Sequence, residues 1–209
     1  MNTEHIAINT QSSIRIGGTK VLYFDPFQIS APSHDADVIF LTHDHFDHLD
    51  PESINKIIAE KTVIIAPEKM RDKLSDWDGK NKVIAVSPGV IIESMSIRIE
   101  AVPACNRLKP FHPKSAGWTG YVVTMDETRY YVAGDTDAVK ELEEISCDIA
   151  MIPIGGKYTM NAKEAAKLIG KIKPAVAIPT HYGSIVGKKE DAQEFAAQVP
   201  SGIIVETKL

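Results

Sequence analysis

The chain has 209 residues and carries 23 basic and 28 acidic side chains, for a formal net charge of -5. This acidic balance and the lack of any run of more than two basic residues argue against a nucleic-acid-binding protein, and no apolar stretch approaches the ~20 residues that span a bilayer. The N-terminal residues lack the basic and apolar regions of a signal peptide, so we expect a cytoplasmic protein whose two cysteines, Cys105 and Cys147, stay reduced.

The N-terminal part of the chain is predicted to consist mainly of short strands. The apolar or alternating runs that predict them are 6–8, 14–16, 20–24 and 38–41. The last run is continuously apolar, which is typical of a strand covered on both faces. Asp50 and Pro51 carry the signals of a helix N-terminus, with the aspartate as cap and the proline in the first helical position.

The middle of the chain continues the strand-rich pattern. Further strands are predicted at 62–66, 83–86, 90–92, 97–102, 121–124 and 129–133. The segment 103–115 contains three prolines and two lysines and is framed by strands, so we expect an exposed but ordered loop. The last two strands are predicted to form a hairpin around Asp126-Glu127.

The C-terminal part alternates between helices and strands. Helices are predicted at about 139–145, 161–171 and 190–198, with strands at 149–152, 175–178 and 203–205. Asn161 and Glu164 have the spacing of a capping box at the start of the second helix. Strand-rich stretches in each half, with helices interspersed, indicate a layered α/β fold of two packed sheets with helices outside.

One short segment carries most of the chemistry. Four potential metal ligands, His43, His45, Asp47 and His48, fall within six residues directly after the predicted strand 38–41. Imidazole and carboxylate groups suit zinc, iron or manganese, and the C-terminal ends of strands are where α/β folds place their sites. We expect Asp44, the remaining acid of this segment, to be solvated or to cap a helix.

The segment resembles the His-x-His-x-Asp-His signature of the metallo-β-lactamase superfamily. Three more segments resemble family motifs in the same order: Asp25-Pro26-Phe27, Ala133-Gly134-Asp135-Thr136 and Pro179-Thr180-His181-Tyr182-Gly183. The pattern is most similar to the small stand-alone metal-dependent hydrolases that include lactonase-like members. The resemblance implies a four-layer αββα sandwich that spans 1–209 as a single domain, with metals at one edge between the sheets.

The resemblance also implies a set of metal ligands. These are His43, His45, Asp47, His48, Asp135 and His181. The first two would bind the first metal, the next two would bind the second, Asp135 would bridge both and His181 would complete the second. Independently of the family, Asp135 and His181 each lie at the end of a predicted strand, where a turn aspartate or a satisfied loop histidine would be the plain alternative.

The sequence departs from the family pattern at the third histidine of the first metal site. Asn106 stands where that histidine is expected, and an amide oxygen is a weak ligand for zinc. His112, in the same loop, either folds back to replace it or is a surface or substrate-contacting histidine. The thiol of Cys105 is soft enough to bind zinc, but a structural role as a small buried residue is the stronger interpretation.

Other residues are candidates for the surroundings of the metals. Asp25 is expected to accept a hydrogen bond from a ligand imidazole and so fix its tautomer. Tyr158 and Tyr182 lie just beyond predicted strand ends and either donate hydrogen bonds to the substrate or only form the rim. The lysine pair Lys109 and Lys114 would favour an anionic substrate.

These observations predict a metal-dependent hydrolase that uses metal-bound hydroxide on a small, anionic lactone or phosphodiester, with Asp47 as the catalytic group that orients the water. We expect one or two zinc ions, with manganese or iron as alternatives. Two other classes stay open: a non-hydrolytic, iron-dependent redox enzyme, and a degenerate metal-binding sensor of the same fold. The expected partner is a small molecule, and a homo-oligomer is compatible with the sequence.

Overall fold

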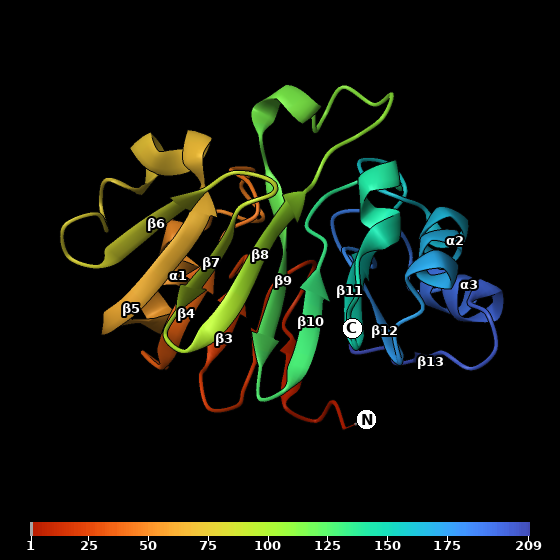
Figure 1. Ribbon diagram of the computed structural model, residues 1–209, viewed down its shortest axis with the longest axis horizontal. Coiled ribbons are helices and arrows are strands. Elements are labelled where there is room, and N and C mark those ends of the chain that lie inside the picture. Colours follow the sequence, from red (N-terminus) through yellow and green to blue (C-terminus); the bar gives the residue numbers. More distant parts are fainter. Residues whose placement is uncertain (1) are drawn as a thin grey trace.

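The computed structural model describes residues 2–209, which form two β-sheets packed face to face (Figure 1). The first sheet has the strand order β1-β2-β3-β4-β5-β6, and its last four strands are parallel to one another. Its strands are β1 (Ile6–Ile8), β2 (Ile14–Ile16), β3 (Leu22–Phe24), β4 (Ala36–Phe40), β5 (Ile58–Pro67) and β6 (Lys82–Val86).

The second sheet has the order β13-β12-β11-β10-β9-β8-β7, with parallel pairing from β10 to β13 and antiparallel pairing from β7 to β10. Its strands are β7 (Ile91–Ser94), β8 (Ile97–Pro103), β9 (Thr119–Met125), β10 (Thr128–Val132), β11 (Ile149–Pro153), β12 (Val176–Thr180) and β13 (Ile204–Val205). The predicted hairpin is formed by β9 and β10, with Asp126 and Glu127 in left-handed turn positions.

Helices lie on the outer faces of both sheets. They are α1 (Pro51–Ile57), α2 (Ala162–Ile172) and α3 (Asp191–Gln198), together with the short 3₁₀ helices η1 (Glu68–Leu74) and η3 (Lys140–Glu144). A third 3₁₀ helix, η2 (Lys114–Ala116), buries no residue and lies in the loop after β8. The predicted caps are confirmed: Asp50 caps α1, and Asn161 with Glu164 forms the capping box of α2. No helix among residues 2–209 is long and apolar enough to cross a membrane.

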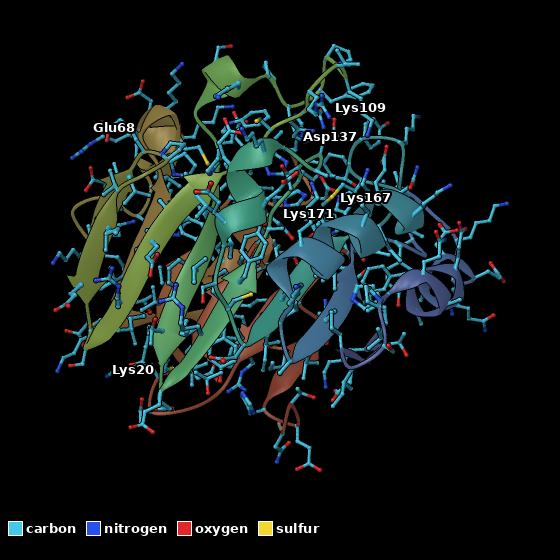
Figure 2. All side chains as sticks on the ribbon, turned by 45° about the vertical axis from the view of Figure 1, so that its right-hand side comes forward. Lys20, Glu68, Lys109, Asp137, Lys167 and Lys171 are labelled. Atoms are coloured by element: carbon cyan, nitrogen blue, oxygen red, sulfur yellow. The ribbon has the colours of Figure 1, made fainter. Side chains whose placement is uncertain are left out.

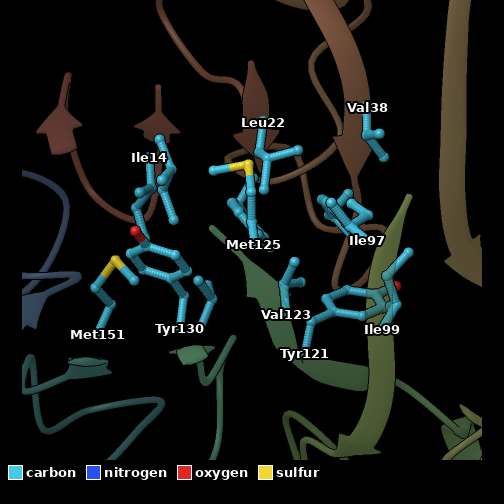
Figure 3. Packing of buried hydrophobic residues seen from close by; sticks show 14 of the residues in the cluster. Ile14, Leu22, Val38, Ile97, Ile99, Tyr121, Val123, Met125, Tyr130 and Met151 are labelled. Atoms are coloured by element: carbon cyan, nitrogen blue, oxygen red, sulfur yellow. The ribbon is translucent and has the colours of Figure 1, made fainter. Parts of the chain in front are cut away.

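The strand periodicity explains why the molecule has four layers. Because successive side chains of a strand point to opposite faces, the continuous apolar run of β4 serves two cores. Val38 and Phe40 belong to the core between the sheets, whereas Ile39 and Leu41 pack in the cluster under α1. Figure 3 shows the inner core, with Val38 among the side chains that meet between the two sheets. The predicted layers are therefore present, helix–sheet–sheet–helix.

Two local expectations need correction. The segment predicted as a helix at 139–145 forms only the 3₁₀ turn η3, which begins after Val139 and lacks a side-chain cap. Residues 68–74 were not predicted as helical, but they form η1 and bury Met70 and Leu74. The i,i+4 spacing of these two apolar side chains was the available signal for a helical turn.

The topology brings the residues that follow five strands, β3, β4, β8, β10 and β12, to one edge of the sandwich. In the first sheet β3 and β4 run parallel, so the residues after both strands lie at the same edge. In the second sheet β10 runs parallel to β11 and β12, and β8 runs in the same direction because both β8 and β10 are antiparallel to β9. The candidate metal ligands all follow one of these strands.

Candidate metal centre

The histidine-rich segment changes direction within six residues. It leaves β4 in an extended conformation and then turns, because the backbone N–H groups of His48 and Leu49 both donate to the carbonyl of His45, at 3.0 and 2.8 Å. His43 and His45 therefore lie before the turn and Asp47 lies within it. This local geometry divides the segment between two groups of side chains.

The first group combines His43 and His45 with His112. Potential ligand atoms of the three side chains all lie within 4.8 Å of one another, and His43 Nε2 is 3.1 Å from His45 Nδ1. The ring of Trp118 covers this group, with its centroid 5.0 Å from both His43 and His45 and 5.5 Å from His112. The structure thus places His112, and not Asn106, beside the first two histidines.

Asn106 takes a different position, as the partner that orients His112. Its Oδ1 accepts hydrogen bonds from the backbone N–H of His112 at 3.0 Å and lies 3.1 Å from Nδ1 of the same residue. Its Nδ2 donates to the carbonyl of Tyr158 at 2.8 Å. An amide oxygen can only accept, so the contact places the imidazole proton on Nδ1 and leaves Nε2 of His112 free as a ligand.

The second group combines Asp47, His48 and His181, whose ligand atoms also lie within 4.8 Å of one another. Asp47 Oδ2 is 3.4 Å from His181 Nε2 and 3.7 Å from His48 Nε2. His181 directly follows β12, and its backbone N–H donates to the carbonyl of Gln11. All three side chains of this group are buried.

Asp135 lies between the two groups. Its Oδ2 is 3.3 Å from His181 Nε2 and 3.4 Å from His112 Nε2, and its Oδ1 is 3.5 Å from His48 Nε2. The residue before it must be glycine, since Gly134 has a φ of +63° and a Cβ there would lie 2.9 Å from Cβ of Thr42. The close approach of these two loops brings the Asp135 carboxylate within reach of histidines from three different loops.

Asp25 contacts the second group from behind. Its Oδ2 is 2.7 Å from His48 Nδ1, and its two oxygens also accept from the backbone N–H and hydroxyl of Thr42 at 2.8 and 2.6 Å. Asp25 and His181 both adopt left-handed backbone conformations, with φ of 44° and 54°. Such strain in non-glycine residues is concentrated at functional sites, where the surrounding structure holds it.

Burial and charge shift the protonation of these groups in opposite directions. Burial lowers the pKa of His43 well below its ordinary value, and the nearby His48 adds to this effect. Burial also disfavours charge on His48, but Asp135 and Asp25 outweigh it and raise the pKa of His48 to about 9. Burial favours the neutral acid at Asp135, yet His181 and His48 hold its pKa well below the usual range. The centre therefore retains anionic carboxylates beside histidines.

The residues fit a metal ion because several ligand atoms lack any other partner. Among residues 2–209, the Nε2 atoms of His48, His112 and His181 and the Oδ1 atom of Asp135 are buried without a hydrogen bond. A buried polar atom without a partner costs about 1–3 kcal/mol, so four such atoms at one place need a compensating group. A cation among imidazoles and carboxylates supplies that compensation.

Several other sequence candidates lie elsewhere. Asp44 points away from the centre and pairs with Lys73 of η1. Cys105 is buried in the cluster under α2, as expected for a small structural residue. Tyr182 also packs in that cluster, 3% exposed, so its ring belongs to the core rather than to the rim. Tyr158 contacts the centre through its carbonyl, which accepts from Asn106.

The lysines of the loop after β8 are already neutralised. Lys109 Nζ is 2.7 Å from Asp137 and Lys114 Nζ is 2.6 Å from Glu141. Both amines therefore hold this loop against the segments that follow β10, which weakens the prediction that they attract an anionic substrate. The sequence reading also missed Thr42, whose position between the apolar strand and His43 was the available signal for its bonds to Asp25.

With this geometry established, comparison with known proteins decides the family. Residues 5–182 match the family model described as "Beta-lactamase superfamily domain". The chain belongs to this superfamily. A relative from Thermococcus onnurineus named UPF0173 metal-dependent hydrolase is 30% identical over 205 residues, covering 88% of this chain and 87% of the relative.

Solved structures agree on the fold of this superfamily member. A proposed metal-dependent hydrolase from Parabacteroides distasonis has a TM-score of 0.84 and 32% identity, covering 98% of this chain and 92% of that chain. CmlA, a diiron β-hydroxylase from Streptomyces venezuelae, has a TM-score of 0.76 at 12% identity, and the match covers 98% of this chain and 52% of CmlA. At this identity the likeness shows the fold alone. The predicted αββα metallo-β-lactamase fold is confirmed.

Proposed function

We propose that the protein is a metal-dependent hydrolase of small molecules, with the metals held by the seven side chains described above. One observation carries the proposal: Asp135 lies within 3.5 Å of a histidine nitrogen from each ligand group. A single carboxylate shared by two groups of imidazoles is the arrangement expected for two neighbouring cations. Named relatives described as metal-dependent hydrolases support the same activity class.

We favour zinc as the metal, in one or two ions, with manganese or iron as alternatives. Five imidazoles and two carboxylates make up the ligand set. Imidazole-rich sites suit zinc, copper and iron, whereas magnesium and calcium prefer oxygen ligands. Bound at this place, a divalent metal would lower the pKa of a water molecule toward neutrality and polarise the substrate.

The chain's own residues then hold protons and position the reactants. Asp47 stays anionic at neutral pH because His181 and His48 lower its pKa against the effect of burial, so it can orient a water molecule and accept its proton. Among the seven side chains only His45 is partly exposed. The substrate therefore approaches on that side, next to the Trp118 ring and Phe46, which is 68% exposed.

We propose a lactone or a phosphodiester as the substrate. Both contain an oxygen that a cation polarises and a bond that water cleaves. The aromatic surface of Trp118 and Phe46 offers an apolar contact for the part of the substrate that does not react. We further propose that the chain acts as a single domain in the cytoplasm on a small molecule, without a nucleic acid or membrane partner.

A redox function with iron is the second candidate, because the same imidazole and carboxylate set also suits iron. The sensor alternative loses its main argument. A degenerate site would lack the third imidazole of the first metal, whereas His112 lies beside His43 and His45 and Asn106 orients it.

The test is hydrolysis by the purified protein after reconstitution with zinc, manganese or ferrous iron in turn. Bis(p-nitrophenyl) phosphate and γ-lactones of increasing chain length would be assayed with metal content and oxygen uptake measured on the same samples. We expect hydrolysis that is lost on chelation and restored by metal, without oxygen uptake. Oxygen consumption without hydrolysis would instead establish the redox function.

A further inference from the structure

A hollow apart from the metal ligands is lined in part by the loop that carries His112. It is a half-open pocket of about 490 Å³, bounded by residues 107–109, by the turn after Asp135, by η3 and by the exposed side of α2. Figure 2 shows Lys109, Asp137, Lys167 and Lys171 gathered on this side of the molecule. The volume lies in the range of ~300–1,000 Å³ that is typical of small-molecule sites.

Every carboxylate that lines the pocket already has a partner. Asp137 accepts from Lys109 Nζ at 2.7 Å and from the backbone N–H of Arg107 at 3.0 Å. Glu143 pairs with Lys171. Glu164 accepts from the backbone N–H of Asn161 at 3.0 Å, as part of the capping box of α2. Glu164 alone has no cationic partner, so the four cations of the lining face three carboxylates and the pocket keeps a net positive charge.

Two cations of the same pocket have no such partner. Among residues 2–209, neither the guanidinium of Arg107 nor the ammonium of Lys167 takes part in an ion pair or a side-chain hydrogen bond that meets ordinary distance limits. The two side chains come from different elements of the lining, Arg107 from the loop after β8 and Lys167 from α2. An anion that reached both would accept charge-assisted hydrogen bonds from each.

The rest of the lining is apolar. Leu108 is 96% exposed, Ala138 is partly exposed, and Leu168, only 1% exposed, lies at the base of the hollow. A leucine so fully exposed beside a hollow gains from contact with an apolar surface. The lining thus combines two unpaired cations with an apolar wall.

We propose that this pocket binds a small organic anion, with one phosphate or carboxylate group bonded to Arg107 and Lys167 and an apolar portion against Leu108. The pocket is separate from the metal centre, because none of the seven metal-ligand candidates lines it. It shares two chain segments with that centre, since Arg107 follows Asn106 and Asp137 lies two residues after Asp135. Its ligand therefore binds behind the loop that positions His112.

The test is a titration of the metal-loaded protein with phenyl phosphate and, separately, with benzoate. Nuclear magnetic resonance of the leucine methyl groups detects binding. We expect saturable shifts of the Leu108 and Leu168 methyls at millimolar concentrations, as is usual for fragments of this size. The variants Arg107→Gln and Lys167→Gln should each weaken binding roughly tenfold, because each removes one charged hydrogen bond. Lys167→Arg should retain it.

Two controls separate the pocket from the metal centre and from general charge effects. Lys163 lies on the same helix as Lys167 but does not line the pocket, so Lys163→Gln should leave binding unchanged. His181→Ala, which disrupts the metal centre, should also leave the leucine shifts in place. Shifts that vanish with His181→Ala but survive Arg107→Gln and Lys167→Gln would assign the anion to the metals and overturn the proposal. No saturable shift with either probe at 20-fold molar excess over ~1 mM protein would overturn it as well.

Discussion

The two ligand groups of the metal centre are built in different ways. In the second group, His181 directly follows β12, where the Gln11 carbonyl holds its backbone N–H, and His48 lies eight residues after β4, where the Asp25 carboxylate contacts its imidazole. In the first group, His112 lies nine residues beyond the end of β8, and one amide, Asn106, orients it. The loop that carries it is held by surface ion pairs such as Lys114 with Glu141, and such pairs contribute little.

The difference predicts unequal metal sites. The imidazole of His48 is held by a charged carboxylate, whereas that of His112 is held by a neutral amide, and hydrogen bonds to a charged group are about twice as strong. We therefore expect the second site, with Asp47, His48 and His181, to fill at lower metal concentration than the first. The following changes test that inequality, and they are ordered by the size of the expected effect.

Asp135→Ala should weaken both metal sites and so remove the difference in affinity between them, because this carboxylate contacts histidines of both groups. We expect loss of tight metal binding at both sites and a fall in hydrolysis of more than ~100-fold, measured by metal analysis of the dialysed protein and by turnover. Asp44→Asn is the matched control, since Asp44 lies in the same histidine-rich segment but pairs with Lys73. Two metals retained in Asp135→Ala would contradict the bridging role.

His112→Ala and His48→Ala should separate the two sites. We expect the first variant to keep one tightly bound ion, because the second group is left intact, and the second variant to lose the tighter ion. Hydrolysis should fall about 100-fold in each, if the reaction uses both ions. Calorimetric titration with zinc gives the stoichiometry and affinity of each site. Identical losses in the two variants would show that the sites fill as one unit.

Asn106→Ala should weaken only the first site. The change removes the acceptor for Nδ1 of His112, and loss of such a supporting bond typically costs about 10–100-fold in metal affinity. Asn106→Asp keeps an acceptor oxygen at the same place and should restore most of the affinity. A second site with unchanged affinity in both variants is the internal control, and equal weakening of both sites would indicate a general loss of structure.

The metal-free protein should show a pH dependence that originates in the second group. The pKa of His48 is raised to about 9 in the folded state, so its stabilisation is complete below the unfolded pKa of about 6.5 and is lost as pH rises toward 9. His43, whose pKa is lowered, is neutral in both states above pH 7 and does not contribute in this window. We expect the melting temperature to fall between pH 7 and 9, and to fall less in Asp25→Asn. A flat profile would contradict the raised pKa.

The sequence predicted those parts of the molecule that depend on local patterns. The apolar run of β4, the caps Asp50 and Asn161 and the positions of His43 and His181 just after strands follow from periodicity and capping chemistry, which act within a few residues. The place of His112 depends on how residues 103–118 fold over the edge of the sandwich. That path is set by contacts distant in sequence, such as Asn106 with Tyr158, and a single sequence does not display them.

The short 3₁₀ helices also depend on contacts that a single sequence does not display. Neither η1 nor η3 has a side-chain cap, so each is held by the apolar residues it buries against its sheet. Tertiary packing, not local propensity, therefore decides whether these residues form a turn, and the prediction of a longer helix at 139–145 exceeded what the local signals support.

The position of Trp118 gives the metal centre an optical reporter of its own. The chain has two tryptophans, and Trp77 is buried on the far face of the first sheet, in the cluster with α1. The indole of Trp118 instead lies 5.0 Å from the rings of His43 and His45. Its fluorescence should respond as ions enter the first site, while filling of the second should change it less. With Trp77 replaced by phenylalanine, the order in which the two sites fill becomes visible in an unlabelled protein.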